Sequence, residues 1–213
     1  MTIDCAEHVL KRLEIKPVVN YLTHYYRGGT PPFRSLSTLS DDEALPLMTA
    51  LCDDTPFGAR FKDPLNYLRA RRLTEEWVRA AFTAKGGQPL EPYPIYMVLG
   101  HSPWIERAVP IAFSTCRMRF PLSIFAEGDV SFTYPDSMIS HEFGIEMPIE
   151  YYRPEYHGQV FTRSEILAIV ATHGMPEKGW EPRLPDHLAP YIEAQVWNRE
   201  PLLTYQEQLL AVA

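Results

Sequence analysis

The chain has 213 residues, of which 46% are hydrophobic and 22% are charged, as in a globular protein with a core of ordinary size. Its net charge of −7, from 20 Lys and Arg against 27 Asp and Glu, argues against broad, sequence-independent binding to nucleic acid. The 20 prolines are about twice the typical share and predict many short elements joined by rigid turns.

The cysteines and the N-terminal segment indicate the cellular setting. Cys5, Cys52 and Cys116 have no metal-type spacing, and three free thiols in a reducing compartment explain them most simply. The first residues lack the pattern of a signal peptide, and no apolar run approaches the length of a membrane span. We therefore expect a soluble, cytoplasmic protein with no membrane partner.

The first half of the chain is predicted to be mainly helical. Residues 4–14 carry an apolar stripe at helical spacing, whereas residues 18–26 are β-branched and aromatic, as in a strand. The capping box Ser40-Asp-Asp-Glu43 predicts a helix that runs to about residue 51. A longer helix is expected to begin at Asp63-Pro64 and to end before Gly86-Gly87, with an apolar face of five residues: Leu73, Trp77, Val78, Ala81 and Phe82.

A cluster of basic residues precedes and enters this long helix. Its members are Arg60, Lys62, Arg69, Arg71 and Arg72. Arg71 and Arg72 each have a glutamate four residues later, and we expect these pairs on the solvent side of the helix. A solvated helix face is the favoured interpretation, and a phosphate site for a nucleic-acid substrate is the alternative.

The second half is richer in strands, and the expected class is α+β, with a helix-rich first half and a mixed or antiparallel sheet with flanking helices in the second. Pro121 predicts an edge strand or a bulge, and the capping box Thr162-Arg-Ser-Glu165 predicts a helix that ends at Gly174. We expect one domain over residues 1–213, with any boundary near 86–92. The expected strands are 93–99, 118–125, 130–134, 159–161 and 191–197.

Glu193 is a candidate for chemistry because of its place in the last predicted strand. Alternation puts Ile192, Ala194 and Val196 on one face, which we expect to be the core. Glu193 then shares the other face with Gln195 and two aromatic residues, which suits the binding of a polar ligand in a cleft. An ordinary solvent-facing glutamate is the alternative.

Two further segments could contribute to a site. His24 lies late in a predicted strand before a Gly-Gly turn, where it could bind a ligand or hydrogen-bond the backbone. Tyr134 could stack on a planar ligand. Asp136 or Ser137 is expected to cap the helix that follows.

Several reaction classes lack their signatures. The histidines show no two-ligand helical spacing, so no metal site is expected. The chain also has no phosphate-binding Gly-x-x-x-x-Gly-Lys loop, no Gly-x-Gly-x-x-Gly after a strand and no Gly-x-Ser-x-Gly.

Three of these segments resemble, in order, the motifs of the ADP-ribosyltransferase superfamily. Tyr21-Leu-Thr-His24-Tyr-Tyr-Arg27-Gly resembles the early strand that holds the nicotinamide ribose. Ser131-Phe-Thr-Tyr134 looks like the middle strand, and Ile192-Glu193-Ala-Gln-Val-Trp197 looks like the late strand with its glutamate. The resemblance covers roughly twenty residues of the chain.

The resemblance implies NAD as a co-substrate, and ADP-ribosyl transfer or NAD glycohydrolysis as the activity of an enzyme. Glu193 would support the oxocarbenium-like transition state, and His24 would assist as the second catalytic residue. The residues implied in substrate binding are Tyr25, Arg27, Ser131, Thr133, Tyr134 and Gln195.

A non-catalytic protein-interaction module is the alternative function. Residues 148–157 are rich in Tyr and Pro, with tyrosines at 151, 152 and 156. Tyrosine is favoured at interfaces because it covers area at low entropic cost. This alternative expects an exposed aromatic patch there and no polar cleft.

Overall fold

A six-stranded sheet forms the centre of the computed structural model, which describes residues 19–52, 58–108, 115–147, 152–176 and 190–212. The strand order is β3-β1-β2-β6-β4-β5, and every neighbouring pair is antiparallel. With its flanking helices, the sheet confirms the α+β class. The strands are β1 (Tyr21–Arg27), β2 (Ile95–Leu99), β3 (Thr115–Pro121), β4 (Val130–Thr133), β5 (Val160–Phe161) and β6 (Glu193–Val196).

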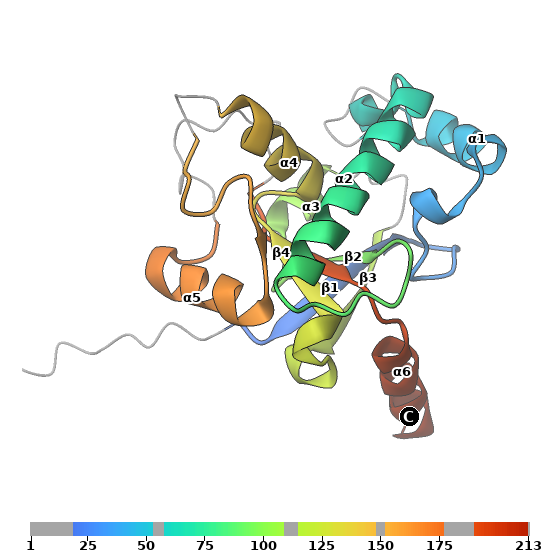
Figure 1. The fold of residues 1–213 in the computed structure, drawn as a ribbon. Helices are drawn as coiled ribbons and strands as arrows, with labels where there is room; N and C mark the ends of the chain where they lie inside the picture. Colours follow the sequence, from blue (N-terminus) through green and yellow to red (C-terminus); the bar gives the residue numbers. More distant parts are fainter. Residues whose placement is uncertain (1–18, 53–57, 109–114, 148–151, 177–189, 213) are drawn as a thin grey trace, which may run out of the picture.

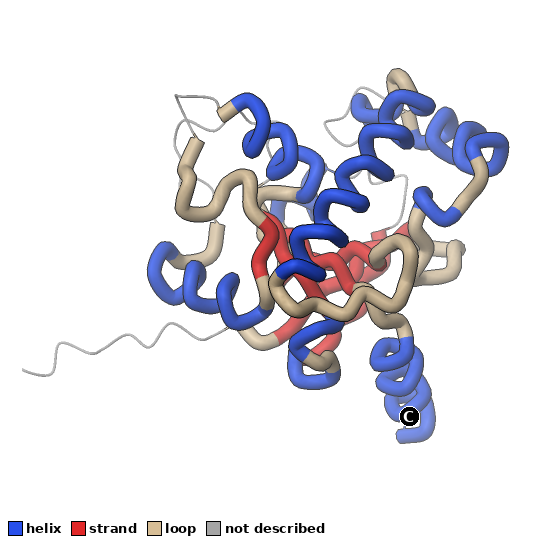
Figure 2. Tube along the Cα trace, viewed as in Figure 1, coloured by secondary structure: helices blue, strands red, loops and turns tan. Residues whose placement is uncertain are grey.

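Helix α2 runs across the sheet, with α1 near its N-terminal end and α4 alongside it, while α6 extends away from the sheet (Figure 1). Figure 2 shows the strands enclosed by helices and loops, with α6 the most peripheral helix. No helix of the described residues combines the length and apolar character needed to cross a membrane. The helices are α1 (Asp41–Leu51), α2 (Pro64–Ala84), α3 (Pro103–Ala108), α4 (Ser137–Glu146), α5 (Arg163–His173) and α6 (Glu200–Val212), and the 3₁₀ turns are η1 (Leu36–Thr38), η2 (Gly58–Phe61), η4 (Leu122–Ile124) and η5 (Glu127–Asp129).

The predicted helix starts are confirmed by their capping bonds. Ser40 accepts a hydrogen bond from the Glu43 amide, and the Glu43 carboxylate accepts one from the Ser40 amide, so α1 opens with a complete capping box. Thr162 opens α5 in the same way. Asp63 caps α2, and Asp136 caps α4 as predicted. The predicted helix at 4–14 lies outside the described residues.

The buried face of α2 differs from the predicted one. Leu73, expected in the apolar face, is 60% exposed. Arg71 and Glu75 were expected on the solvent side, and this was wrong because Glu75 is only 1% exposed. Successive positions of the buried stripe are alternately three and four residues apart. The stripe therefore includes both members of the Arg71–Glu75 ion pair. Its residues are Leu68, Arg71, Glu75, Val78 and Phe82.

The sheet combines strands from both halves of the chain. β1 and β2 lie between β3 and β6, so the first half contributes two interior strands. The strand predicted at 118–125 is shifted, because β3 ends at Pro121 and a 3₁₀ turn follows. β3 is an edge strand, as Pro121 predicted, since proline lacks the amide that an interior strand would need.

The main core lies on one face of the sheet. Ile192, Ala194 and Val196 are all at most 2% exposed and belong to this core, which confirms the predicted aliphatic face of the last strand. α2 packs its Val78 and Phe82 with Trp197 in a separate cluster. The side of β6 that carries Glu193, Gln195 and Trp197 is therefore covered by α2 and is not open to solvent.

Candidate functional site

A cavity of about 420 Å³ lies between the sheet, α2 and the segment that contains η1 and α1. Its volume is within the range of small-molecule binding sites. Strands β1 and β2 and Glu193 form one side, α2 and η2 contribute arginines, and α3 contributes Trp104 and Ile105. Nine elements, distant in sequence, thus supply the walls of one concave site.

Positive charge predominates among the charged residues that line the cavity. Four arginines line it, Arg27, Arg34, Arg60 and Arg71, and among the described lining residues Glu193 is the one carboxylate. Arg27 and Arg34 are exposed, whereas Arg60 and Arg71 are partly buried. The whole chain carries a net charge of −7, so this concentration of positive charge is local. Such a cavity favours an anionic ligand.

The strand register places Glu193 in the wall of this cavity. Glu193 pairs with Val98 of β2 on one side and with Thr133 of β4 on the other. Two residues along, Gln195 pairs with Tyr96 and Ser131. Directly opposed residues point to the same face of a sheet, so these two rows form a polar patch beneath α2.

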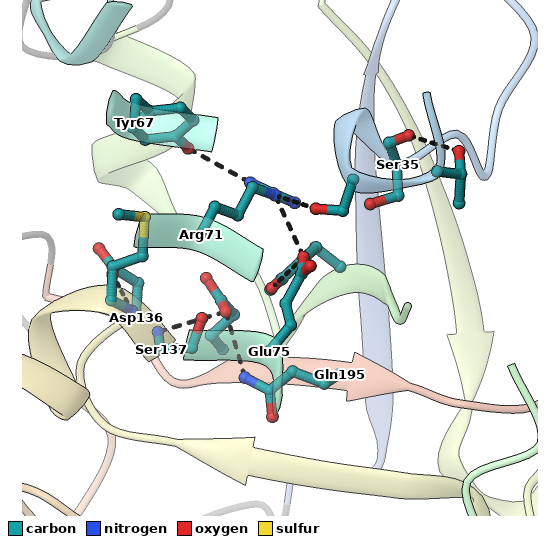
Figure 3. A network of polar contacts seen from close by, with 12 residues as sticks. Ser35, Tyr67, Arg71, Glu75, Asp136, Ser137 and Gln195 are labelled. Atoms are coloured by element: carbon teal, nitrogen blue, oxygen red, sulfur yellow. Dashed lines mark hydrogen bonds and ion pairs between the residues drawn. The ribbon is translucent and has the colours of Figure 1, made fainter. Parts of the chain in front are cut away.

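Hydrogen bonds behind Glu193 hold its carboxyl group in place. Gln195 Nε2 donates to Glu193 Oε1 at 3.1 Å and to Thr133 Oγ1 at 3.0 Å. Ser131 Oγ donates to Gln195 Oε1 at 2.9 Å, and Trp197 Nε1 donates to Ser131 Oγ at 2.9 Å. A buried amide with this many fixed partners has a single favourable orientation. Figure 3 shows Gln195 reaching from β6 into this network.

The environment of Glu193 favours its protonated form. The residue is 8% exposed, and burial, together with the nearby charge of Asp136, raises the pKa of its carboxyl group from 4.5 to about 7. The Ser137 side chain opposes this rise, as do Gln195 and the positive charge of Arg71. The Ser137 amide also donates to Oε1 at 3.3 Å. Near neutral pH the group is therefore close to half ionised, which is typical of acid–base and charge-stabilising residues.

His24 lines the cavity, but the backbone holds both of its ring nitrogens. Nδ1 lies 3.0 Å from the carbonyl oxygen of Tyr96, and Nε2 accepts from the Phe33 amide at 3.0 Å. This is the backbone-bonded alternative considered from the sequence. Because Nε2 accepts, the ring is neutral with its proton on Nδ1, and burial lowers the pKa of His24. His24 thus fixes the loop at Phe33 against β2.

The other predicted residues fall into three groups. Tyr25 and Arg27 line the cavity together with His24 and Glu193. Ser131, Thr133 and Gln195 are fully buried behind Glu193 and contact it directly or through one another. Tyr134 lies outside the cavity lining, and its ring stacks on His157 with 5.6 Å between centroids.

Arg71 is the main site residue whose position the sequence did not predict. Its guanidinium lies 4.3 Å from the centroid of the Tyr96 ring. Nε donates to Ser37 Oγ at 3.1 Å and to Glu75 Oε1 at 3.2 Å, and Nη1 donates to the Tyr67 hydroxyl at 3.2 Å (Figure 3). The 71–75 spacing was visible in the sequence but equally fits an exposed helix pair.

Aromatic side chains contribute the apolar part of the cavity. Trp104 and Tyr191 lie with their ring centroids 6.2 Å apart, and both line it. The Tyr25 hydroxyl accepts from the Ser102 amide at 2.9 Å and donates to Glu106 at 3.2 Å, which links β1 to the start of α3. Flat rings beside arginines suit a ligand that has both a planar base and negative charge.

The tyrosine-rich surface of the alternative function is only partly described. Tyr156 is 5% exposed and packs edge-on against Tyr134 and His157, so it cannot belong to an exposed aromatic patch. Tyr152 is half-buried, and residues 148–151 lie outside the described part of the chain. The polar cavity, which this alternative did not expect, is present.

Within the described residues, no three His, Cys, Asp or Glu side chains are close enough to hold a metal ion. Comparison of the chain with protein-family models, with curated proteins and with solved structures finds no match. The geometry of the cavity and the resemblance of the strand segments near it are therefore the observations that bear on function.

Proposed function

We propose that the protein cleaves the glycosidic bond between nicotinamide and ribose in NAD, and passes the ADP-ribosyl group to an acceptor or to water. The observation that carries the proposal is the position of Glu193, a buried carboxyl group with a pKa near 7 in a cavity whose other charged lining residues are arginines and whose walls include aromatic rings. The resemblance of the segments at His24, Ser131 and Glu193 to ADP-ribosyltransferase motifs supports the same reaction.

The chemistry of the bond explains why a carboxylate is useful there. As the bond from ribose C1′ to the nicotinamide nitrogen breaks, its electron pair leaves with nicotinamide, and positive charge develops on the ribose. An ionised Glu193 stabilises that charge, and the interaction is stronger in a buried site than in water. The acceptor oxygen or nitrogen then bonds to C1′ and loses its proton, so the charge is balanced.

The raised pKa of Glu193 fits this role. Burial raises the pKa because the ionised carboxylate loses its hydration by water. A ligand that develops positive charge beside the carboxylate favours the ionised form and lowers the pKa again. The carboxylate is thus stabilised most when the ribosyl cation forms, and such selective stabilisation is what accelerates a reaction.

The remaining residues take supporting roles in this proposal. Gln195 is a positioning residue because it reaches Glu193 but does not line the cavity. Tyr25 and Trp104 would contact the planar rings of NAD, and the arginines would bind its negative charge. His24 would shape the wall of the cavity through its two backbone bonds.

The direct test measures nicotinamide release from NAD by chromatography, with water alone and with DNA, RNA or protein added as acceptor. Glu193→Gln should lower the rate by about 100-fold or more, because it removes the charge but keeps the shape. Its circular dichroism spectrum and its NAD affinity should remain close to those of the wild type. Glu76→Gln, at an exposed glutamate of α2, is the matched control and should leave the rate unchanged.

Two results would overturn the proposal. The first is a wild-type protein that releases no nicotinamide with any of these acceptors. The second is a folded Glu193→Gln variant that releases nicotinamide at the wild-type rate.

A further inference from the structure

Two arginines in the cavity wall meet at one tyrosine hydroxyl. Arg71 Nη1 donates to the Tyr67 hydroxyl at 3.2 Å, and the side chain of Arg60 also hydrogen-bonds Tyr67. Both arginines line the cavity. Tyr67 thus brings the two side chains together in one part of the cavity wall.

Arg71 is held in one orientation by groups that do not line the cavity. Glu75, which is 1% exposed, accepts from Arg71 Nε at 3.2 Å and from the Tyr96 hydroxyl at 2.8 Å. Ser37 accepts from the same Nε at 3.1 Å. Within the described residues these bonds engage Nε and Nη1 of the guanidinium group. A guanidinium group fixed in this way loses little conformational entropy when it binds an anion.

Acidic side chains lie near both inner arginines of this wall. Glu75 neutralises Arg71, while Arg60 lies in the field of Asp136, whose charge also reaches Glu193. Arg27 and Arg34 add positive charge at the exposed part of the lining. An anion bound between Arg60 and Arg71 would receive charge-assisted hydrogen bonds from both, in the forked geometry that suits phosphoryl oxygens.

We infer that Arg60 and Arg71, bridged by Tyr67, form a diphosphate-binding subsite. The identity of the ligand as a dinucleotide rests on the proposed function, whereas the anion site rests on the geometry of the two arginines. The subsite shares the cavity with Glu193, so it would anchor the diphosphate while the ribose lies near that carboxyl group. The sequence had indicated Arg27 among the substrate-binding residues, and the inner pair is the better candidate for the diphosphate because it is partly buried and fixed.

The test uses isothermal titration calorimetry with three probes: ADP-ribose, adenosine and inorganic pyrophosphate. ADP-ribose should bind at least about 10-fold more tightly than adenosine, and pyrophosphate should compete with it. Arg60→Gln and Arg71→Gln should each weaken ADP-ribose by about 10- to 100-fold and leave adenosine unchanged. Arg69→Gln, at an exposed arginine two residues before Arg71 on α2, is the matched control and should bind like the wild type.

A second variant guards against misfolding, because Arg71 is tied into a buried network. Arg71→Lys keeps the charge but loses the fork, and it should weaken ADP-ribose less than Arg71→Gln does. Circular dichroism checks the fold of each variant. If Arg71→Gln does not fold, the ADP-ribose affinities of Arg60→Gln and Arg71→Lys decide whether the diphosphate subsite exists.

The outcomes separate this inference from the proposed function. Loss of ADP-ribose binding in the folded variants, in a protein that never releases nicotinamide from NAD, would support the subsite and reject the reaction. NAD turnover with the same KM in Arg60→Gln, Arg71→Gln and wild type would support the reaction and overturn the subsite. Equal affinity of the wild type for ADP-ribose and adenosine, or no binding of any probe, would also overturn it.

Discussion

Gln195 donates a hydrogen bond of 3.1 Å to Glu193, although the two residues are only two positions apart on the same strand. Side chains at this spacing point to the same face, and the bond keeps the Glu193 carboxyl group facing the cavity. The same amide group also bonds Thr133, and its oxygen accepts from Ser131. The orientation of Glu193 thus depends on a neighbour that does not line the cavity.

Gln195→Leu tests this dependence. The substitution leaves Ser131 and Thr133 without their buried partner, and we expect the free energy of unfolding to fall by about 2–4 kcal/mol. Turnover of NAD should fall as well, because the carboxyl group loses a fixed donor. Urea denaturation followed by circular dichroism measures the first effect. Gln208→Leu, at an exposed glutamine of α6, should change stability by less than about 0.5 kcal/mol. A fully stable, fully active Gln195→Leu variant would show that the amide is dispensable.

The raised pKa of Glu193 predicts a pH dependence of stability. The folded-state pKa of about 7 exceeds the ordinary value of 4.5, so the folded protein binds this proton more tightly than the unfolded chain. Its contribution to stability is therefore fully present below pH 4.5, is lost as the pH rises to about 7, and amounts to about 3 kcal/mol. Urea denaturation should show that Glu193→Gln, relative to wild type, gains about 2–3 kcal/mol between about pH 5 and about pH 8. A constant difference between the two proteins would contradict the assignment.

His157 predicts a pH dependence of stability opposite in sign to that of Glu193. It is fully buried, and burial together with the charge of Arg153 lowers the pKa of its ring from 6.5 to about 4. The unfolded chain binds this proton more tightly, so the contribution to stability is present above pH 6.5 and is lost as the pH falls to about 4.

His157→Gln removes this titration and isolates its effect. The wild type should lose as much as about 3 kcal/mol more than the variant between about pH 7 and about pH 4, measured by urea denaturation. His101→Gln, at an exposed histidine, is the control and should follow the wild type. Parallel curves for the wild type and His157→Gln would show that His157 does not titrate differently in the folded state.

Trp104 offers an optical signal for binding. Its ring lines the cavity, whereas Trp77 and Trp197 do not, so a bound nucleotide should quench the fluorescence of Trp104. Trp104→Phe should abolish most of the quenching by ADP-ribose and weaken its affinity by about 3- to 30-fold, since the smaller ring stacks less well. Trp77→Phe, at a ring that stacks on His141, should keep both the signal and the affinity. Undiminished quenching in Trp104→Phe would place the ligand elsewhere.

The local parts of the fold were predictable from the sequence. The capping boxes at Ser40 and Thr162 and the proline after Asp63 set helix starts through bonds within four residues. Pro121 indicated an edge strand, because a missing amide is a local property. The alternation at 191–197 correctly assigned the aliphatic face to the core. The sequence also contains a signal for the start of α6, because Glu200 and Pro201 precede an apolar run. This helix was nevertheless not predicted.

The arrangement of the candidate site could not be predicted in this way. The spacing of Arg71 and Glu75 fits an exposed pair as well as a buried one, and only the packing of α2 over the sheet decides between them. Likewise, a histidine at the end of a strand gives no sign of which backbone groups its ring nitrogens will meet.

The sequence by itself determined helix starts, strand alternation and the presence of Glu193 on the polar side of a strand, because these depend on neighbours along the chain. Tertiary structure alone decided that this carboxyl group would be buried with Arg60 and Arg71 in one cavity. The pairing of β6 between β2 and β4, across which α2 is placed, joins residues at least 60 positions apart. Desolvation and charge at the site arise from those long-range contacts, and they set its chemistry.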